Sequence, residues 1–381
     1  MDFTFAPSQN ELAKRVAEFA ADEIAPHRRE QDRSGTYRPG LIEDMAAADL
    51  FALRIPEQYG GLGLDAVSAG IALEQLAAAD LSVCFPVLNA ALIGGVLADN
   101  GDPEQRSAWL PPIARGEAVV ALALTEPDHG TDAAGIQLSA QQDGDGWVLT
   151  GEKTSIMIAT HATHALVFAR TGAAGAHGIS AFYTSLDDAR VHREQLTDLG
   201  CRAGGRGRLV LDGLRVGPRD LVGEPGGGFT AVMRGFGVSR ALIALMAIAV
   251  GNAALDEAYA HATRRTAFGR PIGQFQSVSF PLVEHTTLLH AARLVAYEAL
   301  CRADRGEDPR IPSNMAKWWA PKAAVEATHQ ALLTMGHLGW SEDGPIAQRL
   351  RDVIGLQLAD GTAAATKLTV ARLVLGKEYA P

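Results

Sequence analysis

The feature that most constrains the fold of this 381-residue chain is the spacing of its apolar residues, which changes twice. In the first third, apolar residues recur every three or four positions, as in an amphipathic helix. From about Ala118 the chain changes to short apolar runs separated by Gly and Asp turns, which is typical of β-strands. After the Gly-rich stretch GEPGGG the helical spacing returns and continues to the end. An α+β protein is therefore expected, with a small β domain between two helical domains.

The spacing also predicts where the elements lie. In the first domain, helices are expected over residues 8–24, 39–50, 65–79, 86–100 and 103–115, and Ser8 followed by Glu11 predicts a capping box. Strands are expected in AVVALALT, GWVLTGEK, HALVFAR, GISAFYT and GRLVLDGLRV. The last helices are expected over 229–265, 275–304, 312–336, 345–357 and 362–375. The predicted domains are residues 1–117, 118–225 and 226–381, since one core rarely grows beyond about 300 residues.

Charge and cysteine content narrow the functional classes. A net charge of −10 argues against nucleic acid as the main ligand. The three cysteines, Cys84, Cys201 and Cys301, lack the spacing of a disulfide framework or a zinc site, so a cytoplasmic location without a metal is expected. The longest apolar run, residues 241–250, is about half a membrane span. We therefore expect no membrane partner and interpret this run as a buried helix.

Residues 123–132, ALTEPDHGTD, leave a predicted strand and enter a glycine turn. Thr125 and Thr131 lie close to Gly130, and such a loop can present backbone donors to an electron-rich ring or a phosphate. Because Thr, Pro and Gly are common in any loop, an ordinary connection remains the alternative.

Residues 264–276, RRTAFGRPIGQFQ, place three arginines between two long predicted helices. Arg264, Arg265 and Arg270 in an otherwise acidic protein favour binding of a pyrophosphate. The alternative is a solvated helix end with C-terminal cations.

Residues 357–367, QLADGTAAATK, contain one acid, Asp360, followed by Gly361 and Thr362. Asp before an Ala-rich run predicts a helix start with Asp360 as its cap. The same carboxylate could instead accept a proton from a ligand, and the local pattern does not decide between the two.

Taken in order, these segments resemble the acyl-CoA dehydrogenase family over nearly the whole chain. The resemblance is carried by FTFAPSQNEL, PEQYGGLGLD, ALTEPDHGTD, LTGEKTS, GGGFTAVM, RRTAFGRPIGQFQ and PIAQRLRD. It implies an N-terminal helical domain, a central small β-barrel or sheet and a C-terminal four-helix bundle. It also implies an FAD flavoenzyme that dehydrogenates an acyl-CoA between its α and β carbons. Family members are usually homotetramers or dimers and pass electrons to an electron-transferring flavoprotein.

The resemblance also assigns residues. Asp360 matches the catalytic base that removes the α-proton while the β-hydride passes to flavin N5. Thr131, Arg240 and Gly361 match substrate contacts. The expected cofactor residues are Leu124, Thr125, Gly130, Thr131, Ser155, Met157, Arg265, Phe268, Gln276, Gly336, His337 and Thr362. Arg265 and Gln276 match residues that hold the FAD pyrophosphate and adenosine half, often from the neighbouring subunit.

The chain departs from the family pattern at several of these positions. Most of the family has Glu where this chain has Asp360, and a carboxylate about 1.3–1.5 Å further back costs rate unless the substrate fills the gap. A ring or α-branch would do so, as in the subgroup acting on cyclohexane-1-carboxyl-CoA. Ser155 and Met157 stand where the family has Trp and Thr. His337 replaces a glycine of the family pattern. Its side chain could contact FAD, or it could only pack against its neighbours.

Other functions are weighed against this one. A same-fold lyase or monooxygenase would not need the base, so the acid at 360 counts against it. A dehydrogenase of an acyl group on a carrier protein remains an alternative. A non-enzymatic helical interaction protein is the remote alternative, and it would be colourless where bound FAD gives a yellow preparation.

Overall fold

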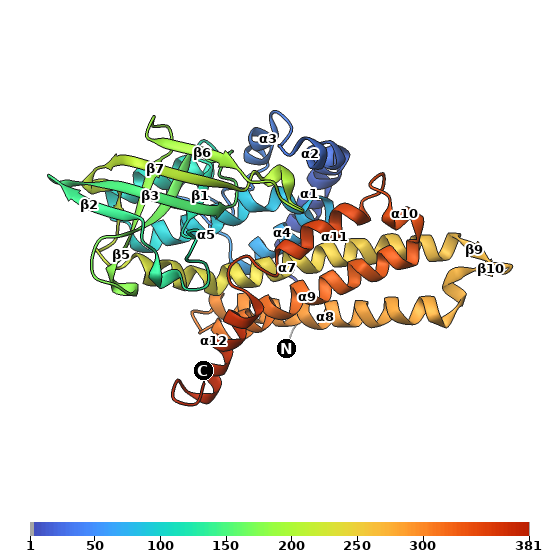
Figure 1. Ribbon diagram of the computed structural model, residues 1–381. Helices are drawn as coiled ribbons and strands as arrows, with labels where there is room; N and C mark the ends of the chain where they lie inside the picture. Colours follow the sequence, from blue (N-terminus) through green and yellow to red (C-terminus); the bar gives the residue numbers. More distant parts are fainter. Residues whose placement is uncertain (1–3, 381) are drawn as a thin grey trace.

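The computed structural model describes residues 4–380 and has the expected order of helical, β and helical parts (Figure 1). The first part contains α1 Pro7–Phe19, α2 Arg28–Ser34, α3 Leu41–Ala47, α4 Ala66–Ala79, α5 Cys84–Asn100 and α6 Pro103–Ala114. All five helices expected here are confirmed, although α1 continues into a π-helical turn, Ala20–Ile24. The capping box is wrong: Ala6 is the N-cap, and its N–H donates to Gln9 Oε1 at 3.0 Å. Pro7 at the first helical position moves the start ahead of Ser8.

The middle part is one mixed sheet. Its strands are β1 Val120–Ala123, β2 Ser139–Asp143, β3 Gly146–Ile156, β4 His164–Arg170, β5 Ile179–Ser185, β6 Val191–Gln195, β7 Gly207–Val216 and β8 Leu221–Val222. The order is β6-β7-β3-β2-β4-β5-β8, and β1 pairs in parallel with β4. The five expected strands are confirmed. Strand β3 is the long one, with β2 on one side and β7 on the other, both antiparallel to it.

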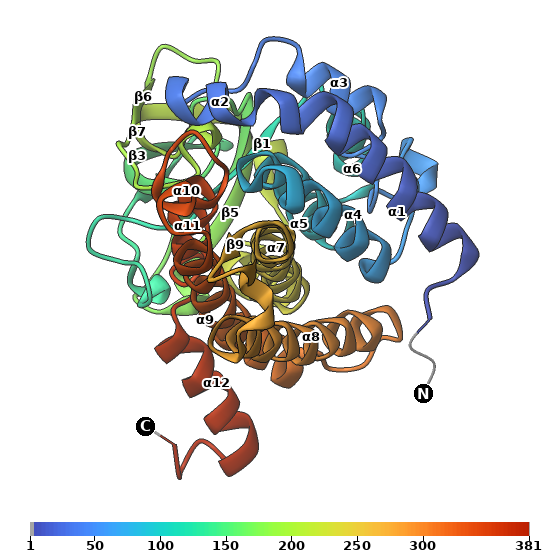
Figure 2. The same ribbon diagram turned by 90° about the vertical axis from the view of Figure 1, so that its right-hand side faces the viewer.

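The third part is built on three long helices, α7 Gly228–Arg264, α8 Gln276–Asp304 and α9 Arg310–Met335. They pack side by side, and the end-on view shows α4 and α5 lying beside α7 (Figure 2). A two-stranded hairpin, β9 Thr266–Ala267 and β10 Arg270–Pro271, joins α7 to α8. The chain ends with α10 His337–Trp340, α11 Ile346–Gly355 and α12 Ala363–Leu375. All five helices expected in this part are confirmed.

Helix α7 connects the β domain to the bundle. Its first turn lies against β5, where Gly227 forms a bridge with Ile179, and a Cβ at Gly228 would approach Ala181 N at 2.5 Å. Residues 241–248 are all at most 1% exposed. The segment 241–250 therefore lies in the bundle core, as expected. Side chains near the start of α7 are held at a fixed distance from the sheet.

Two helical stretches are long and apolar enough, by composition alone, to cross a bilayer. They are Leu81–Asn100 and α7, and 89% and 78% of their apolar windows are buried inside the protein. Such burial is what core helices of a folded domain show. Both stretches are accounted for by packing against the other helices.

Helix α12 extends away from the bundle in both views (Figures 1 and 2). It packs mainly on α9, and Thr366 is its one buried residue. The turn between α11 and α12 therefore lies where the chain leaves the bundle, beside α7 and α9.

Candidate active site

Asp360 lies in the turn before α12 with φ of 50°, in the left-handed region. Gly361 follows with φ of 104°, a conformation that favours glycine. The chain reaches the extended geometry of an N-cap only at Thr362, whose hydroxyl accepts the Ala365 N–H at 3.4 Å. The expectation that Asp360 caps this helix is therefore wrong. Its carboxylate is left for another partner.

That partner comes from α7. The hydroxyl of Ser239, which is 1% exposed, donates a hydrogen bond to Asp360 Oδ2. The next residue, Arg240, donates from Nε to the Asp360 carbonyl oxygen at 2.9 Å and from Nη1 to Asn314 Oδ1 at 3.2 Å. Burial lowers the pKa of Arg240, and the Asp360 charge opposes that shift. One helix thus holds both the side chain and the backbone of Asp360.

A second cation reaches the same turn from α9. Lys317 is 1% exposed, and its Nζ donates to the carbonyl oxygens of Leu356 at 2.8 Å and Gly361 at 3.1 Å. Burial lowers the pKa of Lys317 to about 8, opposed by the Asp360 carboxylate. The turn that carries Asp360 is therefore fixed by α7 and α9 together.

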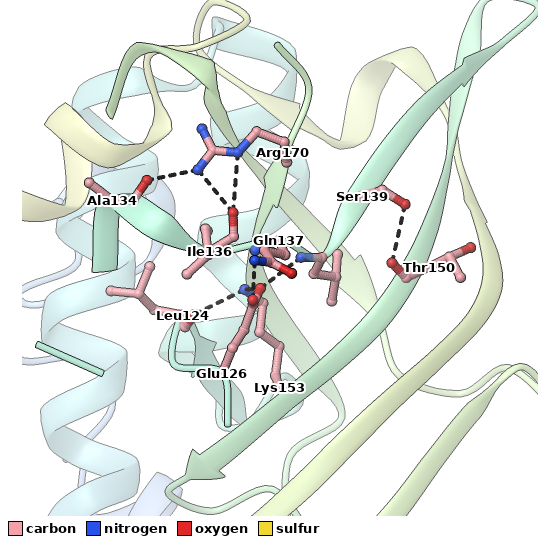
Figure 3. Close-up of polar contacts among 10 residues, drawn as sticks. Leu124, Glu126, Ala134, Ile136, Gln137, Ser139, Thr150, Lys153 and Arg170 are labelled. Carbon is pink, nitrogen blue, oxygen red and sulfur yellow. Dashed lines mark hydrogen bonds and ion pairs between the residues drawn. The ribbon is translucent and has the colours of Figure 1, made fainter. Parts of the chain in front are cut away.

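The loop after β1 is built on a buried ion pair (Figure 3). Lys153 on β3 is fully buried; its Nζ donates to Glu126 Oε1 at 2.8 Å and to the Leu124 carbonyl at 2.9 Å. Glu126 also accepts the backbone N–H groups of Gln137 at 2.6 Å and Leu138 at 2.9 Å. Burial lowers the pKa of Lys153 to about 8, against the effect of Glu126. Burial opposes ionisation of Glu126, but Lys153 and the two N–H donors outweigh it and lower its pKa.

Arg170, at the end of β4, fixes the other side of this loop. Its guanidinium donates to the carbonyl oxygens of Ala134 at 2.7 Å and Ile136 at 2.9 Å (Figure 3). It also reaches the Gly175 carbonyl at 2.6 Å. Glu126 is held by Lys153 and Ala134 by Arg170, so both ends of the segment 127–133 are fixed.

Part of this loop has open donors. The hydroxyls of Thr125 and Thr131 have no hydrogen-bond partner within residues 4–380. A Cβ built at Gly130 would meet no atom within 4 Å. Hydroxyl and backbone donors beside an open glycine suit an electron-rich ring. The residues present here therefore fit the flavin that the resemblance implies.

Ser155 and Met157 lie beside this loop, because the Thr154 N–H donates to the Thr125 carbonyl at 2.9 Å. Ser155 has φ of 58°, and its hydroxyl accepts from Arg206 Nη1 at 2.9 Å. Met157 is partly buried and packs against the core close to Gly204. An arginine-bound hydroxyl thus stands where the family has an aromatic ring.

A second group of expected cofactor residues lies far from this site. Arg265 is 25 residues beyond Arg240 along α7, which at about 1.5 Å per residue is roughly 37 Å. Phe268 is 96% exposed in the turn of the β9–β10 hairpin, and Gln276 is exposed at the start of α8. Figure 1 shows this hairpin at the tip of the bundle. These residues do not meet Asp360 within one chain.

Gly336 and His337 belong to this distant group. The pKa of His261, near the end of α7, is lowered by burial, then by the nearby charges of Arg265 and Arg264, and also by His337. His337 therefore lies at the same end of the bundle as Arg265. The expected site residues form two groups, one around the start of α7 and one at its far end.

The three arginines of the hairpin segment have different partners. Arg264 donates from Nε to the Ala260 carbonyl at 3.0 Å, and Arg270 lies over the Phe275 ring at 4.1 Å from its centre. The side chain of Arg265 makes no hydrogen bond or ion pair within residues 4–380. Its guanidinium is therefore available to an anionic ligand.

Neither Ser239 nor Lys317 was predicted from the sequence as a site residue. A signal for Lys317 is present, since it is a lone cation within the apolar helical stretch NMAKWWA, and a buried cation needs partners. Ser239 differs from other helical serines in no local feature of the sequence. Trp318 and Trp319, which follow Lys317 on α9, are partly buried, and Lys367 lies over the Trp318 ring.

Comparison with known proteins agrees with this architecture. Residues 6–117, 121–214 and 226–375 match the family models described as Acyl-CoA dehydrogenase, N-terminal domain, middle domain and C-terminal domain. The 3-(aryl)acrylate reductase of Clostridium sporogenes is 31% identical over 97% of this chain and 100% of its own. The mitochondrial short-chain specific acyl-CoA dehydrogenase of Sus scrofa is 33% identical over 97% of this chain and 90% of its own.

Solved structures agree as well. Butyryl-CoA dehydrogenase from Megasphaera elsdenii superposes with a TM-score of 0.96 at 30% identity, over 98% of this chain and 100% of its own. The helical, β and helical order, the flavin-compatible loop and the family models all point the same way. The chain therefore belongs to the acyl-CoA dehydrogenase family, whose members are FAD-dependent oxidoreductases acting on CH–CH bonds.

Proposed function

We propose that this protein dehydrogenates a ring-bearing or branched acyl-CoA between its α and β carbons, with Asp360 as the base. The observation that carries the proposal is the state of the Asp360 carboxylate. One oxygen, Oδ2, accepts the Ser239 hydroxyl, whereas Oδ1 has no partner within residues 4–380. A fixed carboxylate with one free oxygen is suited to take a proton from a bound thioester.

The α-proton of a thioester is removed more easily when its carbonyl oxygen accepts hydrogen bonds, because negative charge develops there. Bound FAD supplies the acceptor for the β-hydride. Asp360 takes the α-proton on Oδ1. Arg240 and Lys317 hold the turn by its carbonyl oxygens. The backbone N–H of Asp360 has no partner within residues 4–380, so it can donate to the thioester carbonyl. Thr125 and Thr131 supply hydroxyl donors on the β-domain side.

The short side chain of Asp360 supports the substrate class. Asp is one methylene shorter than the Glu usual in the family, and a displacement of about 1 Å can cost roughly a hundredfold in rate. A ring or branch at the α carbon, as in cyclohexane-1-carboxyl-CoA, would bring the proton closer. One relative is named as a 3-(aryl)acrylate reductase, for an acid whose ring lies on the β carbon of an α,β double bond. That name supports a ring-bearing acyl group, and the short Asp360 side chain is the support for a ring or branch at the α carbon.

The wider setting is part of the proposal. Arg265, just after α7, and Gln276, at the start of α8, lie at the far end of the bundle from the Asp360 site of their own chain. A second copy would bring them to it, in a homotetramer or a dimer. An electron-transferring flavoprotein is proposed as the electron acceptor. Three free cysteines are compatible with a cytoplasmic location.

A thioester panel tests the substrate class. The purified FAD-loaded protein and its Asp360→Glu variant are mixed anaerobically with straight, branched and cyclic acyl-CoA thioesters, and the loss of flavin absorbance is timed. We expect the fastest reduction with cyclic or branched thioesters, and a shift of preference toward straight chains in Asp360→Glu. If Asp360→Glu gains on straight chains and loses nothing on cyclic ones, the substrate class is wrong. The same acyl groups bound to a carrier protein are tested in parallel, and faster flavin reduction by them would show that the substrate is carried by a protein rather than by CoA.

A further inference from the structure

The buried serine of α7 is the least expected partner of Asp360. Serines inside helices commonly donate to the carbonyl four residues earlier or point to solvent. Ser239 does neither: it is 1% exposed, and its hydroxyl donates to Asp360 Oδ2, 121 positions away in sequence. The buried Ser239 hydroxyl on α7 therefore fixes the Asp360 side chain in the turn before α12.

The other two groups at this turn act on its backbone. Arg240 Nε reaches the Asp360 carbonyl, and Lys317 Nζ reaches the carbonyls of Leu356 and Gly361. Neither donates to the Asp360 carboxylate in the structure. The direction of the carboxylate therefore depends on one contact, the hydrogen bond from Ser239.

We propose that Ser239 is a positioning residue for proton abstraction: by holding Oδ2 it turns Oδ1 toward the α-proton of the substrate. The inference rests on the proposed role of Asp360 as base and adds the residue that aims it.

The positioning role can be measured as a separation of kcat from KM. Removing the hydroxyl in Ser239→Ala frees the carboxylate to rotate, and we expect kcat to fall about tenfold to a hundredfold while KM stays within about twofold. Ser239→Cys keeps a weak donor of similar size, so its kcat should lie between those of Ser239→Ala and the wild type.

The charged groups that face Asp360 are Arg240 from α7 and Lys317 from α9, and none of these variants changes them. Ser313→Ala is the matched control, because Ser313 is a fully buried serine of α9 whose hydroxyl has no hydrogen-bond partner within residues 4–380. This control should keep the wild-type kcat and KM.

The experiment uses the FAD-loaded full chain and cyclohexane-1-carboxyl-CoA labelled with deuterium at the α carbon. Mass spectrometry follows exchange of the label with water, and stopped-flow absorbance follows flavin reduction. We expect slower label exchange and slower flavin reduction in Ser239→Ala, with FAD content and thermal unfolding as in Ser313→Ala.

Asp360→Gly separates the two proposals, because glycine accepts a φ of 50° and removes the carboxylate. Label exchange that persists in Asp360→Gly contradicts the role of Asp360 itself. Exchange lost in Asp360→Gly but unchanged in Ser239→Ala, with an unchanged kcat, overturns the role of Ser239 alone.

Discussion

The ammonium of Lys317, buried on α9, donates a hydrogen bond to the backbone carbonyl of Gly361 at 3.1 Å. The same ammonium also donates to the Leu356 carbonyl, so Lys317 binds both ends of the turn between α11 and α12. The turn holds a non-glycine residue, Asp360, in the left-handed region, which persists only when its surroundings fix it. Lys317 therefore stabilises the one conformation in which Asp360 can face a substrate.

Replacing Lys317 with Met should loosen this turn. Two carbonyl oxygens lose their donor, at a cost of about 1–3 kcal/mol for each one left buried and unpaired. We expect a lower free energy of unfolding in urea and a flavin reduction rate that falls by at least about tenfold. Lys322→Met on the same helix is the control, since Lys322 is 61% exposed and its pair with Glu326 is worth little. Equal effects in both variants would contradict the account.

Replacing Glu126 with Gln should destabilise the loop that carries Thr125. The change leaves Lys153 buried without its counter-charge, which typically costs about 3–5 kcal/mol. We expect weaker retention of FAD on dilution, together with a lower urea midpoint. Glu152→Gln serves as the control, because it alters the partly exposed pair between Glu152 on β3 and Arg208 on β7. Wild-type FAD retention in Glu126→Gln would show that the ion pair does not support the flavin loop.

The junction of the three domains should make stability depend on pH. Asp352 on α11 accepts the Cys201 N–H at 2.6 Å; burial, with Asp80 adding to it, raises the pKa of Asp352 to about 7. Burial also raises the pKa of Asp80 to about 6. In the unfolded chain both titrate near pH 4. Between about pH 4 and 7 the folded protein therefore holds protons that the unfolded chain has released, so the free energy of unfolding falls as the pH rises.

Urea unfolding at pH 5, 6, 7 and 8 measures this slope, to which one such group contributes up to about 1.4 kcal/mol per pH unit. Asp352→Asn keeps an acceptor for the Cys201 N–H but cannot ionise, so its profile should be flatter. The exposed Asp187→Asn is the control. A profile in Asp352→Asn as steep as in the wild type would contradict the account.

The helices and the buried strands could be predicted because their apolar residues recur at regular spacing. Strands β2 and β6 could not be, since SAQQD and VHREQ are mostly exposed and carry no apolar alternation. They are strands because β3 and β7 pair with them. Their pairing is a property of the sheet rather than of the segments themselves.

The site was predictable only in part, for a related reason. The role of Asp360 as a base came from the family resemblance. The local sequence pattern alone favoured Asp360 as a helix N-cap. Asp360 instead has a left-handed φ, and Thr362 is the N-cap. Ser239 and Lys317 reach this turn from 121 and 44 positions away. Contacts across a helical bundle depend on how its helices pack, and no local spacing records them.

The most direct test of the central claim compares anaerobic flavin reduction by saturating cyclohexane-1-carboxyl-CoA in the wild type and in Asp360→Gly. A general base contributes about a hundredfold to ten-thousandfold to the rate. The account predicts rapid loss of the yellow absorbance in the wild type and a rate at least about a hundredfold lower in Asp360→Gly, with FAD content unchanged. Reduction of the variant at the wild-type rate would show that another group removes the α-proton.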